Sequence, residues 1–167
     1  IWKGLDLVIE AFKKLKTDSK LHIFGPVENE RKFYNFYKNY FDNNDSIYFH
    51  GMVDVNSDYF KEIIKSCAFT VFPGSSEGGA SSVLTSMHLG LIPIVTTQSS
   101  IDLDNFGILI EELQVNSTKL AMEKAQMLDK KEISRQRNAV IKHIEKNHST
   151  TNYRNSFEEA LKQIINL

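Results

Sequence analysis

The strongest constraint on the fold is a segment rich in glycine and serine that lies between two short apolar runs. Residues 68–72 and 91–95 are the apolar runs, and residues 73–90 combine small polar residues with a stretch at helical spacing. This order predicts a strand, a turn, a helix and a second strand. A helix between two strands returns the chain to the same edge of a sheet, so we expect the strands to be parallel. The apolar character of residues 68–72 is typical of a strand buried on both faces.

Helices and strands alternate along the rest of the chain as well. The alternation predicts an α/β fold, a Rossmann-like doubly wound parallel sheet with helices on both faces, in one domain over residues 1–167. The expected helices cover residues 4–16, 28–41, 58–66, 81–89, 117–128, 131–147 and 149–166, and the expected strands cover 21–24, 47–50, 68–72, 92–96 and 107–111. The helix at residue 117 is expected to begin with a serine or threonine cap.

The composition argues against several classes of function. The 20 Lys and Arg balance 21 Asp and Glu, and a net charge of -1 argues against a nucleic-acid partner. Cys67 is the only cysteine, and the five histidines are not spaced as metal ligands, so we expect neither disulfides nor a metal site. His50, at a predicted strand end, is the one histidine kept as a site candidate, with a packed imidazole as the alternative. No apolar run approaches the roughly 20 residues of a membrane helix, and we expect a cytoplasmic protein.

The glycine-rich turn is the main candidate for ligand binding. Small residues surround Glu77 there: Ser75, Ser76, Gly78, Gly79, Ser81 and Ser82. Unpaired backbone N–H groups at a helix N-terminus favour a phosphate, because the macrodipole adds partial positive charge. A carboxylate at the mouth of such a turn is suited to accept hydrogen bonds from a polyhydroxyl group attached to the phosphate, which points to a nucleotide sugar. A plain turn with a serine cap is the alternative.

Two further features concern charge. Lys3 precedes the first predicted helix, at the same carboxyl edge of the sheet as Glu77, where ligands of doubly wound folds bind. Its ammonium would neutralise a diphosphate, and an ordinary solvated lysine is the alternative. Residues 119–146 carry eight Lys or Arg against four acids, which indicates either a solvated helix surface or a peripheral contact with anionic lipid at the inner face of the membrane.

Six blocks of sequence, taken in order, resemble one enzyme family. The blocks are Lys3-Gly-Leu-Asp-Leu-Val-Ile-Glu-Ala-Phe, Leu21-His-Ile-Phe-Gly, Tyr48-Phe-His-Gly-Met-Val, Ala68-Phe-Thr-Val-Phe-Pro-Gly-Ser-Ser-Glu-Gly, Gly90-Leu-Ile-Pro-Ile-Val and Gly107-Ile-Leu-Ile. They are similar to the C-terminal, donor-binding domain of retaining GT-B glycosyltransferases of family 4, also called glycosyl transferases group 1. The resemblance runs from about residue 3 to residue 112. It implies that the chain is part of a larger two-domain protein, with a first strand of the sheet and an N-terminal acceptor-binding domain upstream.

The resemblance also implies roles for individual residues. Lys3 would contact the diphosphate, together with an upstream arginine, and Glu77 would lie by the sugar hydroxyls; these are the expected catalytic residues. The backbone after Glu77 would hold the phosphate and the sugar, and the backbone of Gly51 and Met52 would border the base. The expected donor-binding residues are Lys3, Gly51, Met52, Ser76, Glu77, Gly78, Gly79, Ser81, Ser82 and Thr85. In this family a second Glu usually stands at the position of Thr85 and binds the ribose. Thr85 departs from the family pattern, and we expect it to lower the affinity for the donor.

The resulting hypothesis is transfer of a hexosyl group, with retention, from a nucleotide diphosphate sugar to a surface polysaccharide or glycolipid acceptor. No cofactor besides that donor substrate is expected, because Lys3 and the helix N-terminus would supply positive charge to the departing diphosphate. Two alternatives stay open. A nucleotide-sugar epimerase shares the GT-B architecture, and a noncatalytic binding module would explain Thr85.

Overall fold

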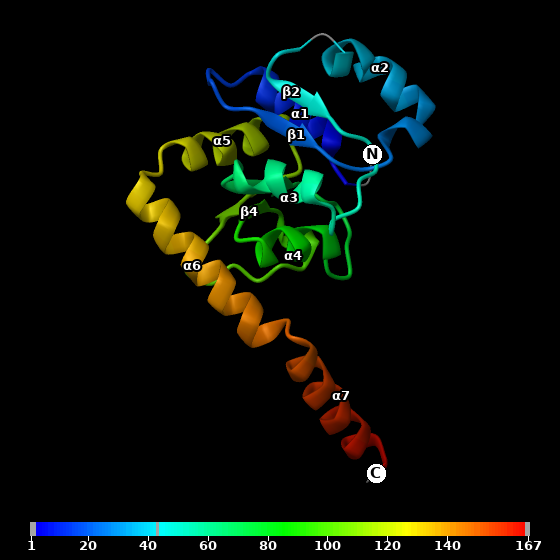
Figure 1. Ribbon diagram of the computed structural model, residues 1–167, viewed down its shortest axis with the longest axis vertical. Helices are drawn as coiled ribbons and strands as arrows, with labels where there is room; N and C mark the ends of the chain where they lie inside the picture. The colour runs from blue at the N-terminus through cyan, green and yellow to red at the C-terminus, as the bar shows by residue number, and fades with distance from the viewer. Residues whose placement is uncertain (1–2, 43, 166–167) are drawn as a thin grey trace.

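The computed structural model describes residues 3–42 and 44–165 and has the expected α/β architecture, with parallel strands flanked by helices (Figure 1). The helices are α1 (Leu5–Lys13), α2 (Arg31–Asp42), α3 (Asp58–Lys65), α4 (Ser81–His88), α5 (Val115–Gln126), α6 (Lys130–Asn147) and α7 (Thr150–Ile165). The strands are β1 (Leu21–Ile23), β2 (Ile47–Phe49), β3 (Phe69–Phe72), β4 (Ile92–Val95) and β5 (Ile108–Leu109). Two 3-10 turns, η1 (Val27–Asn29) and η2 (Thr97–Ser99), follow β1 and β4.

The sequence located these helices and strands correctly but misjudged several of their ends, and residue 166, the expected end of the last helix, lies outside the described residues. The first helix stops at Lys13 instead of residue 16, and α2 begins late because the 3-10 turn η1 precedes it. The expected cap at Ser117 is wrong, since α5 begins at Val115 and its N-cap, Gln114, makes no side-chain cap bond. The Ser117 hydroxyl lies inside the helix and accepts a hydrogen bond from the backbone N–H of Glu112 instead.

The strands pair in parallel in two groups. In one group Leu21 lies opposite Ile47 and Ile23 opposite Phe49. In the other, β4 is central, with β3 and β5 on its two sides. Consecutive residues of β4 face opposite layers, since Ile94 packs toward α5 while Val95 packs toward α4 and α6. Helices therefore cover both faces, as the doubly wound pattern predicts.

The two groups of strands leave β1 and β3 with one partner each among the described residues. Doubly wound sheets run in the order 3-2-1-4-5-6, in which the first strand lies between the second and the fourth. The observed pairings, β2 with β1 and β3 with β4 with β5, correspond to positions 3-2 and 4-5-6 of that scheme, and no described strand fills its first position. The expectation that residues 68–72 form a strand buried on both faces is wrong for Phe69–Phe72, which are all half-buried, whereas all of Ile92–Val95 are buried. A strand with one open edge is less covered than a central one.

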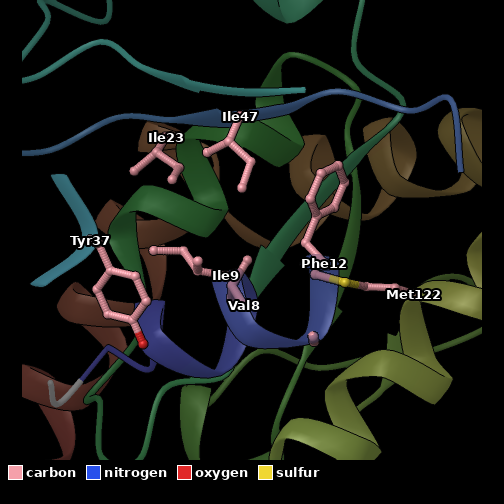
Figure 2. Packing of buried hydrophobic residues seen from close by; sticks show 8 residues of the cluster. Val8, Ile9, Phe12, Ile23, Tyr37, Ile47 and Met122 are labelled. Carbon is pink, nitrogen blue, oxygen red and sulfur yellow. The ribbon is translucent and has the colours of Figure 1, made fainter. Parts of the chain in front are cut away.

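Helix α1 packs against strands of both groups. Its buried face packs against Ile23 and Ile47 of the first group and against Met122 of α5 (Figure 2). Val71 of β3 borders the same cluster, so α1 bridges the two groups of strands. Removal of its apolar stripe from water is worth roughly 1.5–3 kcal/mol per large side chain. The first helix is consequently a fixed support for Lys3 and Gly4, which precede it.

The C-terminal helices extend beyond the sheet. Helix α6 packs on α4 through Val140 and Ile144, whereas α7 leads away from the rest of the domain and buries none of its residues (Figure 1). None of the described helices combines the length and the apolar character needed to cross a membrane.

Candidate functional site

Lys3 and Glu77 lie side by side, as their places in the predicted topology indicate. Lys3 Nζ is 3.9 Å from Glu77 Oε1, with the lysine side chain 69% exposed and the glutamate 23% exposed. The lysine ammonium also lies 6.0 Å from the centre of the Phe72 ring, at the end of β3. A separation of 3.9 Å between partly exposed groups contributes little to stability. The pair is thus loosely engaged, and both groups are accessible to a ligand at the carboxyl edge of the sheet.

A close backbone contact places Lys3 there. Gly4, the N-cap of α1, has a left-handed conformation with φ of 67°, and a Cβ atom on it would lie 2.3 Å from the carbonyl oxygen of Pro73. Only glycine allows this approach. Because Pro73 opens the loop that carries Glu77, the contact holds the start of α1 against that loop.

The loop presents unpaired backbone donors around Glu77. The N–H groups of Glu77 and Ala80 donate to the carbonyls of Gln98 and Ser99, at 3.0 and 3.3 Å. In the described part of the chain, no hydrogen bond is found for the backbone N–H groups of Gly78 and Gly79, and Ser81 and Ser82 occupy the first turn of α4, where N–H groups have no intrahelical acceptor. These four donors make a concentrated partial positive charge suited to a phosphate.

The plain capped turn that the sequence left as an alternative is not what forms. The N-cap residue of α4 is Ala80, whose side chain makes no cap hydrogen bond, and the serines lie one and two positions later, inside the helix. Ser76 is exposed at the mouth of the loop. The helix start is therefore left uncapped by the protein itself, which favours the ligand-binding interpretation.

Thr85 lies one turn further along α4 than Ser81. Its hydroxyl donates to the Ser81 carbonyl at 2.9 Å, and its side chain is half-buried. The hydroxyl proton is therefore used within the helix, and the oxygen retains only neutral acceptor capacity. A full negative charge, as a glutamate would bring, is absent from this position.

The loop between β3 and α4, residues 73–80, carries Glu77 and is called the Glu77 loop. Gly51 and Met52 are not joined to it by any hydrogen bond or ion pair among the described residues. They follow β2 in the other group of strands, where the N–H of Gly25 donates to the Gly51 carbonyl at 2.8 Å. Gly51 has φ of 65°, and the Met52 side chain is 75% exposed. Both lie at a carboxyl end of the sheet, as expected, but the structure leaves their relation to the Glu77 loop without a direct contact.

His50 is packed and hydrogen-bonded. Its Nε2 lies 3.0 Å from His22 Nδ1, and its Nδ1 lies 2.7 Å from the Tyr59 hydroxyl. Burial, with a smaller contribution from the neighbouring His22, lowers the pKa of His50, and burial also lowers the pKa of His22. The packed-imidazole alternative is therefore the one the structure supports. The described residues contain no group of three or more His, Cys, Asp or Glu placed to hold a metal.

Sequence reasoning missed the segment 96–100 behind the Glu77 loop. Thr96 and Ser99 are buried polar residues, and Ser100 is the one described non-glycine residue with positive φ, at 55°. The Ser100 hydroxyl donates to the Glu77 carbonyl at 2.9 Å, and the Thr96 hydroxyl donates to the Gly74 carbonyl at 2.6 Å. One feature of the sequence could have indicated this segment. It is the run of polar residues directly after an apolar strand, Thr96-Thr-Gln-Ser-Ser100.

Comparison with known proteins identifies the class of domain. The model of the family "Glycosyl transferases group 1" matches residues 1–160. No curated protein sequence matches the chain. Among solved structures, a glycosyltransferase from Rickettsia africae superposes with a TM-score of 0.82 at 18% identity, over 99% of this chain and 45% of the other.

Two more structures share the fold. The catalytic domain of starch synthase IV from Arabidopsis thaliana, bound to ADP and acarbose, gives a TM-score of 0.64 at 17% identity, over 84% of this chain and 32% of that one. The catalytic domain of cholesterol-α-glucosyltransferase from Helicobacter pylori gives 0.62 at 23% identity, over 89% of this chain and 92% of that one. The chain thus spans less than half the length of the first two structures. At these identities the likeness shows the fold, which is that of GT-B glycosyltransferases.

Proposed function

The chain belongs to the glycosyl transferases group 1 family, and we propose that it is the donor-binding domain of a retaining enzyme that transfers a hexosyl group from a nucleotide diphosphate sugar. The observation that carries the proposal is the meeting of Lys3, Glu77 and four unpaired backbone N–H groups at one loop. Cationic and amide donors are suited to a diphosphate, and a carboxylate beside them is suited to sugar hydroxyls.

In the proposed reaction, the bond between the anomeric carbon and a diphosphate oxygen breaks while the acceptor oxygen bonds to that carbon and gives its proton to the departing diphosphate. Negative charge develops on the departing nucleoside diphosphate. Lys3 and the N-terminus of α4 are placed to stabilise that charge, which is how a preorganised site lowers a barrier. In this scheme the chain's own groups supply the positive charge, and Glu77 orients the sugar.

The acceptor is proposed to be a glycan or glycolipid held by a further domain upstream of this chain. The open position between β1 and β3 supports an additional parallel strand, and the length of the Rickettsia africae structure supports additional sequence. The Helicobacter pylori enzyme, a cholesterol-α-glucosyltransferase, supports a hexose as the transferred group. The base is proposed to lie near the backbone of Gly51 and Met52.

Calorimetric titration with UDP, GDP and ADP, and with UDP-glucose, GDP-mannose and ADP-glucose, tests the proposal. We expect one base to be preferred, with Lys3→Ala weakening both the nucleotide and the sugar nucleotide, and Glu77→Gln weakening only the sugar nucleotide. Lys65→Ala, at an exposed ion pair with Glu62 on α3, is the control for loss of a surface lysine. Absence of binding to all six compounds would instead favour the noncatalytic module that Thr85 suggests.

An epimerase is separated from a transferase by its products. With donor alone, an epimerase releases an altered free sugar or sugar nucleotide, whereas the proposed enzyme consumes donor in proportion to acceptor. Product analysis with and without a glycolipid acceptor, on the protein together with its upstream domain, decides between them.

A further inference from the structure

One short segment, residues 96–100, makes several hydrogen bonds to the Glu77 loop. Thr96 donates its hydroxyl to the Gly74 carbonyl at 2.6 Å, and this bond is buried. The Glu77 N–H donates to Gln98 at 3.0 Å, and the Ala80 N–H donates to Ser99 at 3.3 Å. Segment 96–100 therefore contacts the loop at residues 74, 77 and 80, that is, at its start, its centre and the beginning of α4.

At the centre, both backbone polar groups of Glu77 are occupied by this segment. The N–H of Glu77 bonds to the Gln98 carbonyl, and the carbonyl of Glu77 accepts from the Ser100 hydroxyl at 2.9 Å. These two bonds hold the two peptide groups that flank the Glu77 Cα atom, and the orientation of those groups fixes the direction in which the side chain leaves. The carboxylate consequently emerges on the side of Lys3.

The same bonds determine which N–H groups stay unpaired. Glu77 and Ala80 are satisfied by segment 96–100, while the intervening Gly78 and Gly79 are not. A Cβ atom on Gly78 or Gly79 would meet nothing within 4 Å, so neither is restrained by packing of its own. Anchors on both sides of the two glycines are what hold their N–H groups in place.

Ser100 adopts a conformation that costs free energy. Its φ of 55° and ψ of 38° lie in the left-handed region, which a residue with a Cβ atom seldom occupies. Such strain persists only where other contacts enforce it. Two hydrogen bonds hold Ser100 here, that of its N–H to the Thr97 carbonyl at 3.2 Å and that of its hydroxyl to the Glu77 carbonyl.

We propose that Ser100 and Thr96 are positioning residues for the donor sugar, acting through the backbone of the Glu77 loop. This inference rests on the proposed function, in which Glu77 contacts the sugar hydroxyls. Neither residue is required to touch the donor. Their hydroxyls hold the loop so that the carboxylate and the two glycine N–H groups are aligned before the donor arrives, which preserves affinity by avoiding an ordering cost on binding.

Ser100→Gly is the sharpest test, because glycine accepts a left-handed φ without strain while it lacks the hydroxyl. We expect this variant to melt within a few degrees of the wild type, yet to bind the preferred sugar nucleotide about three- to ten-fold more weakly, the usual effect of losing one hydrogen bond. Binding of the corresponding nucleoside diphosphate is expected to weaken less than that of the sugar nucleotide, because it depends on the glycine N–H groups but has no sugar for Glu77 to contact. A general loss of structure would weaken both ligands alike.

A double-mutant cycle shows whether Ser100 acts through Glu77. In a Glu77→Gln background, Ser100→Gly is expected to have a smaller effect on sugar-nucleotide affinity than in the wild type, because the carboxylate that it orients is already changed and only the glycine N–H groups are still affected. Thr96 offers a matched pair of variants. Thr96→Ser keeps the hydroxyl that bonds to Gly74 and is expected to preserve affinity, whereas Thr96→Val keeps the volume, loses that bond and is expected to weaken the sugar nucleotide selectively.

Amide hydrogen exchange measures the anchoring without a ligand. In Ser100→Gly the backbone N–H groups of Glu77 and Ala80 are expected to exchange roughly ten-fold faster, because local opening of the loop becomes easier, while core N–H groups such as that of Val140 keep their rates. Wild-type affinity in Ser100→Gly, or equal losses for both ligands, would overturn the inference and leave the proposed function standing. A wild type that binds no sugar nucleotide would overturn both.

Discussion

Lys3 Nζ and Glu77 Oε1 lie 3.9 Å apart, although 74 positions (77 − 3) separate the two residues in sequence. The lysine precedes the first helix and the glutamate follows the third strand, and parallel topology brings these two points to one edge of the sheet. Two opposite charges that meet at a ligand-binding edge without a tight ion pair are more useful for binding than for stability.

The contact between Gly4 and Pro73 predicts a loss of stability on Gly4→Ala. The new Cβ atom would lie 2.3 Å from the Pro73 carbonyl oxygen, at a φ of 67° that disfavours any side chain. We expect the free energy of unfolding in urea to fall by about 2–4 kcal/mol, since strain and overpacking combine. Gly78→Ala is the matched control, because a Cβ atom there meets nothing within 4 Å. Equal stability of the two variants would show that the contact does not fix the start of α1.

Removal of the Lys3 ammonium is expected to leave stability nearly unchanged. Lys3→Ala breaks a partly exposed pair, which is worth about 0–1 kcal/mol. Urea unfolding of Lys3→Ala beside Lys65→Ala checks this, because the Lys65 side chain, paired with Glu62, is about as exposed as that of Lys3. A much larger loss for Lys3→Ala would indicate a structural role instead of a ligand-binding one.

Thr85→Glu is expected to tighten donor binding. The threonine hydroxyl already donates within α4, so it offers only a neutral acceptor to a ribose, whereas a carboxylate accepts two hydrogen bonds with full charge. We expect affinity for the preferred sugar nucleotide to rise about three- to ten-fold, as charge-assisted bonds allow. Thr85→Gln keeps the size of the glutamate without its charge and should gain less. No gain with glutamate would mean that the ribose lies elsewhere or is bound differently.

Acidification is expected to destabilise the domain through His22 and His50. Burial lowers the pKa of each below its ordinary value of 6.5, so between 6.5 and the lowered values the unfolded chain binds more protons than the folded one. Stability is therefore complete above 6.5 and declines as pH falls through the folded pKa values. Urea unfolding from about pH 8 to about pH 5 measures this decline in the range where histidine titrates.

The double variant His22→Gln, His50→Gln should flatten that pH profile. The exposed His88→Gln serves as its control, and His148, whose pKa burial also lowers, leaves a residual slope in both. The carboxylate of Glu132 does not interfere, because its hydrogen bond with Arg135 lowers its pKa to about 2. An unchanged slope in the double variant would show that the imidazole pair does not govern the acid response.

The sequence predicted most of the fold because its signals are local. Helical spacing in residues 5–13 and the apolar run 92–95 each specify one element, and alternation of such elements predicts a parallel sheet. The half-buried state of Phe69–Phe72 could not be predicted in this way, because it depends on whether a second strand pairs with β3. The apolar pattern of a strand reflects which of its faces pack against helices. It does not show how many other strands pair with it.

The candidate site was predictable to a similar degree. Glu77 and its glycines form a continuous motif, and topology alone brings Lys3 to them. Segment 96–100 escaped prediction because its contacts with the loop are made by side-chain hydroxyls and backbone carbonyls, and a polar run after a strand is also what an ordinary surface turn looks like. Only the fold reveals that this run lies against Gly74, Glu77 and Ala80.

Backbone amide shifts on addition of nucleoside diphosphate test the proposed site most directly. Titration of the isotopically labelled chain with UDP, GDP and ADP is predicted to shift the N–H signals of Gly78, Gly79, Ser81 and Ser82 for at least one nucleotide. The core signal of Val140 should stay unchanged, and the shifts should weaken in Lys3→Ala. Shifts confined to other parts of the domain, or none with any of the three nucleotides, would contradict a diphosphate site at the Glu77 loop.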